Sequence, residues 1–128
     1  MKELFMNGQQ EERFYNIYKN DLKLDSYADK DWFSLIFIIS GNERLYSLRH
    51  RLIDFRSKGI NSEIWFDQGL SGGEDRLLAL AYNLFTHMDY YEFEDGRKKY
   101  ISPLEVFSGL DEYNFTLAIN ALCIRSID

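Results

Sequence analysis

The sequence predicts a mainly α-helical (α+β) protein, a compact bundle of five or six helices with one small β-hairpin. Three observations predict this class. Capping residues precede apolar runs of helical spacing at several points. The stretch Trp32–Ile39 has seven apolar residues among eight, so no face of it can stay in water at low cost. A single Asp95-Gly96 pair marks a tight hairpin turn. With 45% hydrophobic residues, the 128 residues can form one domain, 1–128, with a buried core.

The first helix is predicted from Gly8 to Leu22, because Asn7 and Gln10 have the spacing of an N-cap and its N3 partner. Ser26 is predicted to cap a second helix that contains Trp32–Ile39 and ends at Ser40-Gly41-Asn42. A buried strand explains residues 35–39 almost as well. The Asp-rich start favours the helix, because carboxylates stabilise a helix N-terminus.

A third helix is predicted from Asn42 or Glu43 to Lys58, with Gly59 ending it. It carries five basic and two acidic residues and forms the basic patch of an otherwise acidic chain. Two interpretations stay open. Arginine stems cover the edges of an apolar stripe and pair with acidic neighbours, or the patch binds a nucleotide-like anion. The candidate anion-binding residues are Arg44, Arg49, His50 and Arg51. Residues 60–67 are predicted as a short strand or an extended loop.

Ser71 and Glu74 form a capping box that predicts a fourth helix, with an apolar arc reaching Met88. Glu74 in its first turn argues against phosphate binding at Gly72-Gly73. A β-hairpin is predicted from Tyr90 to Ile101, with Asp95-Gly96 as a two-residue turn. That turn would pair Glu94 with Arg97 and Glu92 with Lys99 on one face, and Tyr91 with Tyr100 on the other.

Ser102, with Pro103 at the first helical position, predicts a short helix that ends near Gly109. Asp111 is predicted to cap the last helix. This helix is apolar on two faces, so it either lies centrally or forms a homodimer contact. One face has Phe115, Ala118, Ile119 and Leu122, and the other has Leu117, Ala121 and Ile124.

The net charge of −6 excludes a general nucleic-acid binder, which needs a basic surface, so direct nucleic-acid contact is not expected. No Walker A, dinucleotide or Gly-x-Ser-x-Gly motif is present, so no catalytic residue and no cofactor are predicted. The two histidines, His50 and His87, have no cysteine at ligand spacing, so no metal site is predicted. Cys123 lies in an apolar run and is interpreted as a buried structural thiol.

The apolar stretch is too short to cross a membrane, and the N-terminal residues form no apolar signal segment, so a cytoplasmic location without membrane contact is expected. The hairpin segment Asp89–Gly96 has four carboxylates and three aromatic residues in eight positions. Carboxylates can occupy the places where a basic groove expects phosphates, and aromatic residues anchor interfaces. The candidate partner-binding residues are Asp89, Tyr90, Tyr91, Glu92, Glu94 and Asp95.

Three sequence blocks carry a resemblance: Ile38-Ile39-Ser40-Gly41-Asn42-Glu43-Arg44-Leu45-Tyr46, then Leu70-Ser71 with Leu78–Leu84, then Leu110–Phe115 with Leu117–Ala121. They resemble an uncharacterised family of small proteins from Gram-positive bacteria and their phages and mobile elements. The resemblance implies no catalytic residue. Together with the small size, the net charge of −6 and the lack of catalytic motifs, it implies a small binding protein in a bacterial host cell that inhibits a basic nucleic-acid-binding or defence protein, such as a CRISPR effector. The alternatives are a small-ligand or nucleotide-binding domain that uses the basic face of residues 44–51, and an enzyme of unrecognised type.

Overall fold

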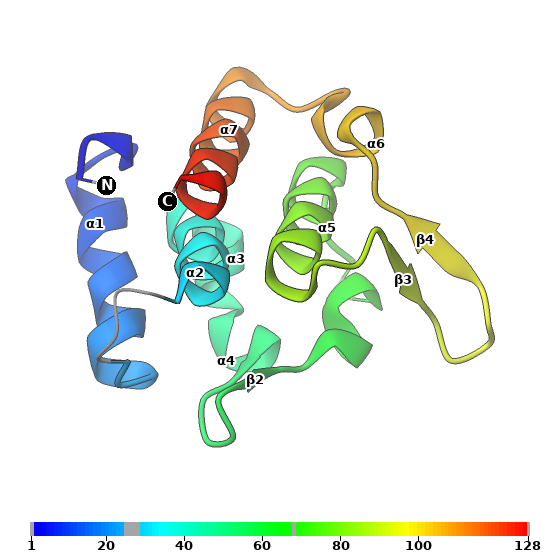
Figure 1. Ribbon diagram of the computed structural model, residues 1–128, viewed down its shortest axis with the longest axis horizontal. Helices are drawn as coiled ribbons and strands as arrows, with labels where there is room; N and C mark the ends of the chain where they lie inside the picture. Colours follow the sequence, from blue (N-terminus) through cyan, green and yellow to red (C-terminus); the bar gives the residue numbers. More distant parts are fainter. Residues whose placement is uncertain (1, 25–28, 68, 128) are drawn as a thin grey trace.

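The structure, a computed structural model, describes residues 2–24, 29–67 and 69–127. Its helices confirm the prediction of a mainly α-helical protein (Figure 1). Two small antiparallel hairpins accompany them, one more than predicted. The elements in chain order are η1 (Lys2–Leu4), α1 (Gly8–Tyr15), η2 (Asn16–Asp21), α2 (Lys30–Gly41), α3 (Glu43–Ser47), α4 (Arg49–Leu52), β1 (Ile53–Asp54), β2 (Gly59–Ile60), η3 (Ser62–Asp67), α5 (Gly72–Thr86), β3 (Tyr90–Glu92), β4 (Lys98–Tyr100), α6 (Pro103–Phe107) and α7 (Glu112–Ser126).

Helix α2 is the centre of the fold. Every residue from Trp32 to Gly41 is buried, and α1, α5 and α7 pack against this helix. Figure 1 shows α2 between α1 and α5, with α7 along it. The helix is therefore confirmed over the alternative of a buried strand. The carboxylate of Asp29 accepts from the Trp32 N–H at 3.2 Å and caps the helix. The predicted cap, Ser26, lies outside the described residues.

The first helix begins as predicted, with the Asn7 side chain accepting from the Gln10 N–H at 2.8 Å. It changes character after Tyr15, where η2 continues as a π-helix. The Leu22 N–H reaches the carbonyl of Ile17 at 2.8 Å, a step of five residues. The apolar residues that recur at helical spacing along this segment are all buried: Phe14, Ile17, Tyr18 and Leu22.

The predicted helix over 43–58 is wrong beyond Leu52. The chain forms α3 and α4 and then turns into the β1–β2 hairpin, where Ile53 pairs with Ile60. The Asp54 carboxylate accepts from the N–H groups of Arg56 and Ser57 at 3.0 and 3.1 Å. Such local bonds offer the backbone an alternative to helix, and this one closes the hairpin.

The region predicted as a strand or loop is mostly a 3₁₀-helix, η3, and only Gly59–Ile60 is strand. Trp65 breaks the weak alternation of this region because it points inward. Its indole is fully buried and donates to the Leu52 carbonyl at 2.9 Å. The Trp65 side chain thereby holds η3 against the end of α4.

Helix α5 begins at the predicted capping box, with the Ser71 hydroxyl accepting from the Glu74 N–H at 3.4 Å. It ends at His87, which adopts a left-handed conformation with φ of +68°. Met88, predicted to extend the apolar arc of this helix, lies beyond its end and is exposed. The His87 conformation therefore ends the helix at Thr86, two residues before the end of the hydrophobic pattern at Met88.

Helices α6 and α7 begin at the predicted caps, Ser102 and Asp111. The inner face of α7 is buried against α2, and its outer face is exposed. The buried residues are Leu117, Ala118, Ala121 and Ile124, and the exposed apolar residues are Phe115, Ile119 and Leu122. The face that contains Leu117 is therefore central, and a homodimer contact through the outer face stays a prediction. At the other end of α7, Arg125 contacts Asp31 of α2 at 2.9 Å.

Gly41 lies at the close crossing of α2 and α7. A methyl group at this position would overlap the Leu117 side chain and lie 2.8 Å from the Gln10 amide nitrogen. We expect Gly41→Ala to lower the free energy of unfolding by about 1–3 kcal/mol, the usual cost of overpacking. Urea unfolding checks this value. Gly8→Ala is the control, because a methyl group there meets nothing within 4 Å.

Candidate functional site

The β3–β4 hairpin projects at the edge of the molecule (Figure 1), and its register differs from the prediction by one residue. Tyr90 pairs with Tyr100, Tyr91 with Lys99 and Glu92 with Lys98. The last paired residues are Phe93 and Arg97, so the loop has three residues, with Gly96 in a left-handed conformation. A three-residue loop with this ending is the other common hairpin connection, and Asp-Gly suits both.

Burial of aromatic side chains explains the observed register. Tyr91 is only 8% exposed, and its ring packs edge-on against Phe66 and Tyr82 at 4.9 and 5.4 Å. Because residues that oppose each other point to the same side, Lys99 also turns inward and binds Asp75 of α5 at 2.8 Å. The predicted Glu92–Lys99 and Glu94–Arg97 pairs are therefore absent. Arg97 instead binds Asp95 at 2.7 Å.

The outer face of the hairpin carries the remaining candidate residues. Asp89, Glu92 and Glu94 are exposed, and Tyr90 is half-buried and pairs with Tyr100, which is 64% exposed. Among the described residues, no basic side chain makes an ion pair with Glu92 or Glu94. Of the six predicted partner-binding residues, Tyr91 thus lies inside, Asp95 is paired, and the other four stay available at the surface.

A cleft of about 440 Å³ lies between this hairpin and η3. We call it the acidic cleft, because four carboxylates and one guanidinium line it together with two aromatic rings. The lining residues are Glu63, Ile64, Asp67, Tyr91, Phe93, Glu94, Asp95 and Arg97. Sequence reasoning missed Glu63 and Asp67, because only the packing of η3 on the hairpin brings them to this place.

The electrostatics of the acidic cleft favour a cation. Burial raises the pKa of Tyr91, and Tyr82 and the carboxylates of Asp67, Glu63 and Glu94 raise it further. The backbone N–H and guanidinium of Arg97 donate to Asp95 and lower the pKa of its carboxyl, so Asp95 stays ionised. The guanidinium of Arg97 lies 4.6 Å from the Phe93 ring centroid. The cleft thus already holds the guanidinium of Arg97 by a carboxylate contact and a ring contact.

The basic segment places its four candidate residues in different surroundings. Arg49 donates to the Tyr46 carbonyl at 3.0 Å and lies 3.7 Å from Asp21. His50 packs edge-on against Phe55. Arg44 and Arg51 are exposed and point to no common pocket among those seen in the described part of the chain. Arg49 therefore fits the interpretation of an arginine paired with an acidic neighbour, and binding of an anion by these four residues stays a prediction.

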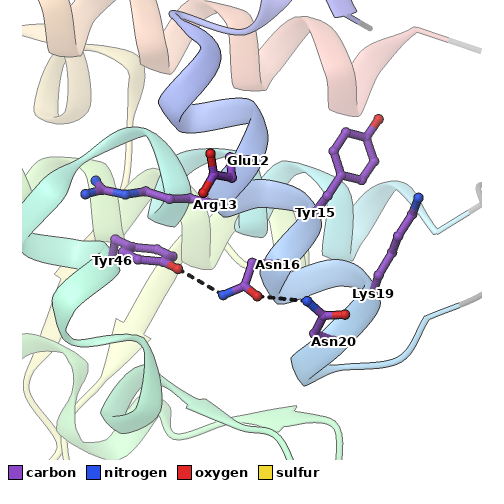
Figure 2. Close-up of a pocket in the computed structure, with 7 residues that line it drawn as sticks. All are labelled: Glu12, Arg13, Tyr15, Asn16, Lys19, Asn20 and Tyr46. Carbon is purple, nitrogen blue, oxygen red and sulfur yellow. Dashed lines mark hydrogen bonds between the residues drawn. The ribbon is translucent and has the colours of Figure 1, made fainter.

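A second cleft, also of about 440 Å³, lies between α1, η2 and α3, and we call it the α1–α3 cleft (Figure 2). Its lining residues are Glu12, Arg13, Tyr15, Asn16, Lys19, Asn20 and Tyr46. Figure 2 shows Arg13 and Lys19 on either side of two amides, those of Asn16 and Asn20. The sequence of the first helix gives no sign that Tyr46, 30 positions after Asn16, would contact this segment.

Buried amides join three helix ends near this cleft. The Gln10 amide donates to the Phe37 carbonyl at 2.9 Å and accepts from the Met6 N–H. Asn42 caps α3 and donates to Asn114 of α7 at 3.4 Å. Tyr113 donates to the Gly41 carbonyl at 2.5 Å. These hydrogen bonds join α1, α2 and α7, and most of these residues also line a smaller cleft of about 330 Å³.

In the parts of the chain that the structure describes, no three His, Cys, Asp or Glu side chains are grouped as a metal site. None of the described helices is long and apolar enough to cross a membrane. Cys123 is a free thiol and is partly buried, less enclosed than predicted.

The chain matches the model of DUF6075, a family of unknown function, over residues 1–126. No curated protein and no solved structure matches it. The family match covers nearly the whole chain and assigns no role to any residue.

Proposed function

Since the chain belongs to DUF6075, whose function is unknown, we propose from the geometry of the site that this protein acts by protein–protein interaction. The proposed contact is the outer face of the β3–β4 hairpin together with the acidic cleft. The partner is a basic protein, and an arginine or lysine of that partner enters the cleft.

The observation that carries this proposal is the acidic cleft, in which Glu63 and Asp67 of η3 face Glu94 and Asp95 of the hairpin. Carboxylates beside aromatic rings are suited to an arginine, which bonds carboxylates and stacks on rings. Tyr90 and Tyr100 pair across the hairpin with ring centroids 6.3 Å apart and supply aromatic anchors of the kind that dominate interfaces. Glu92 and Glu94 need not break an internal ion pair to meet a partner.

We propose further that the partner is a nucleic-acid-binding or defence protein of a bacterial host, and that the chain inhibits it in the cytoplasm. The carboxylates would take the places of nucleic-acid phosphates in the partner's groove. The resemblance to proteins of Gram-positive bacteria, their phages and mobile elements supports this finer proposal, as does the net charge of −6.

The test compares two triple variants with equal net charge. In the hairpin variant, Glu92→Gln, Glu94→Gln and Asp95→Asn remove three exposed carboxylates. In the control, Glu43→Gln, Glu105→Gln and Glu112→Gln remove three exposed carboxylates from other faces. Both variants should fold with nearly the stability of the natural chain, because exposed charges contribute only about 0–1 kcal/mol. Thermal unfolding checks this expectation.

Partner binding should then separate the two variants. With a partner captured from a host lysate and purified, the hairpin variant should associate about tenfold more slowly, and the control should keep the natural rate. The difference should shrink at higher salt, and duplex DNA should compete with the natural chain for the partner. Equal association by both variants would contradict the proposed contact, and a partner that DNA does not displace would contradict the proposed mode of inhibition.

A further inference from the structure

We propose that the α1–α3 cleft binds a small phosphate monoester of mononucleotide size. This site is separate from the acidic cleft, and its ligand is an anion rather than a cation, so the inference is independent of the proposed protein contact. Arg13 would bind the phosphate oxygens, Tyr46, Asn16 and Asn20 would orient the ligand, and Lys19 would lie at the opposite side of the cleft (Figure 2).

Arg13 is the main reason to expect an anion. Its guanidinium lies 4.7 Å from the centroid of the Tyr46 ring and is half-buried, so its position is held by stacking. Among the described residues, no carboxylate forms an ion pair with it. The fork of N–H donors of an arginine matches phosphate geometry, and stacking leaves the edge of the guanidinium free to donate.

A chain of hydrogen bonds prepares Tyr46 as a further donor. The Asn20 amide donates to Asn16 at 2.9 Å, and the Asn16 amide donates to the Tyr46 hydroxyl oxygen at 3.1 Å (Figure 2). Because the hydroxyl oxygen already accepts, its own hydrogen can be donated to a ligand oxygen in the cleft. Lys19, stacked 5.0 Å from the Tyr15 ring centroid, adds a second cation at the other side of the amides.

The backbone of this site includes a π-helix, a rare conformation that supports the assignment of a ligand-binding site. Asn16, Lys19 and Asn20 all lie on the π-helix η2, whose wider turn sets their spacing. Segments of π-helix are rare and occur frequently at functional sites. In this chain the π turn lies where α1 passes Tyr46, and the bond between Asn16 and Tyr46 joins the two segments.

Size and charge define the ligand. The volume of about 440 Å³ falls within the range of small-molecule pockets and exceeds what a bare phosphate needs. Two cations against one carboxylate, Glu12, give the lining a net charge of +1 in a chain of net charge −6. The aromatic and amide groups can contact an attached sugar or base, so we infer that a phosphate ester binds better than free phosphate.

Isothermal titration with adenosine 5′-monophosphate, inorganic phosphate and adenosine tests the site. The monophosphate should bind and raise the Tm, and adenosine should not bind. Phosphate binding as tight as that of the monophosphate would assign the site to free phosphate. Arg13→Gln should weaken monophosphate binding about tenfold to hundredfold, because a charge-assisted hydrogen bond is lost. Glu12→Gln should strengthen it, because a repelling carboxylate is removed.

The expected effects of Arg13→Gln and Glu12→Gln on monophosphate affinity are opposite. Charge variants outside the cleft distinguish a specific site from general electrostatic attraction. Arg56→Gln and Lys58→Gln are the controls, because each removes one exposed cation outside the cleft. They should leave the affinity within about twofold. Absence of monophosphate binding, or an equal loss in Arg13→Gln and both controls, would overturn the proposal. The Tm of each variant without ligand shows whether it is folded.

Discussion

Replacing Leu117 by Glu is expected to abolish cooperative folding at neutral pH. Leu117 is fully buried where α7 crosses α2, next to Gly41. Keeping a buried carboxyl neutral at pH 7 costs about 1.36 kcal/mol for each unit above its usual pKa of about 4.3, or about 4 kcal/mol. The lost burial of the leucine side chain adds about 1.5–3 kcal/mol. Together these terms approach the whole stability of a typical domain, about 5–15 kcal/mol.

Because burial raises the pKa of the new carboxyl in the folded state, the penalty grows as the pH rises above about 4.3 and disappears below it. Urea unfolding followed by circular dichroism should therefore show a partial recovery of the Leu117→Glu variant near pH 4. Ile119→Glu is the matched control, since Ile119 lies on the exposed face of the same helix. It should fold at pH 7. A cooperative transition of normal midpoint in Leu117→Glu would contradict the central position of this face.

Ile119→Glu also tests the predicted homodimer. If the outer face of α7 joins two copies, the natural chain has the mass of a dimer by light scattering and the variant that of a monomer. Equal masses for both would remove this face from consideration as a dimer contact.

Phe37→Ala is expected to lower the free energy of unfolding by about 3–5 kcal/mol. The Phe37 side chain is fully buried in α2, and its ring stacks on that of Phe5 with centroids 5.6 Å apart. Truncation leaves a cavity between α2 and the N-terminal segment that neighbouring helices cannot fill without moving. The midpoint of urea unfolding, with an unchanged m-value, measures the loss.

Phe115→Ala is the control for this change, since the side chain removed is the same but is 43% exposed. We expect that variant to lose less than about 1 kcal/mol, because little apolar surface leaves the core. Similar losses in the two variants would mean that α2 is not the centre of the core.

The parts of the fold predicted correctly are those decided within a few residues. Asn7, Ser71, Ser102 and Asp111 each bond an N–H three positions later, so their signals are visible in the sequence itself. The apolar density of Trp32–Ile39 likewise predicted a central element without any knowledge of its neighbours.

The predicted hairpin register was wrong because the Asp95-Gly96 pair suits both a two-residue loop and a three-residue loop. Only the packing of Tyr91 on Phe66 and Tyr82 decides between them, and these contacts are set by η3 and α5. The helix predicted to end at Lys58 was wrong beyond Leu52, because the apolar periodicity continues through Phe55 although Asp54 begins a turn. In the hairpin a contact with distant segments decided the register. At Asp54 a side-chain hydrogen bond outweighed the helical periodicity.

The two clefts were beyond sequence reasoning for a related reason. Asn16 and Tyr46 are 30 positions apart, and neither segment alone shows that a π-helix will bring them within hydrogen-bonding distance. The hairpin residues were identified from composition, but Glu63 and Asp67 joined them only through tertiary packing. A cluster of charged residues can thus be recognised in the sequence, whereas the residues that line the opposite wall of the cleft cannot.

The central position of α2 has a consequence for synthesis on the ribosome. Helix α7 packs on α2, and Gly41 and Tyr113, which are joined by a hydrogen bond, are 72 positions apart. At a translation rate of about 5–20 residues per second, the ribosome needs about 4–14 seconds to synthesise the chain from Gly41 to Tyr113 of α7. During that interval α7 cannot yet cover the apolar surface of α2, and chaperones or other nascent chains can bind that surface. A ribosome that stalls before residue 111 would leave this segment uncovered and direct the product to aggregation or proteolysis.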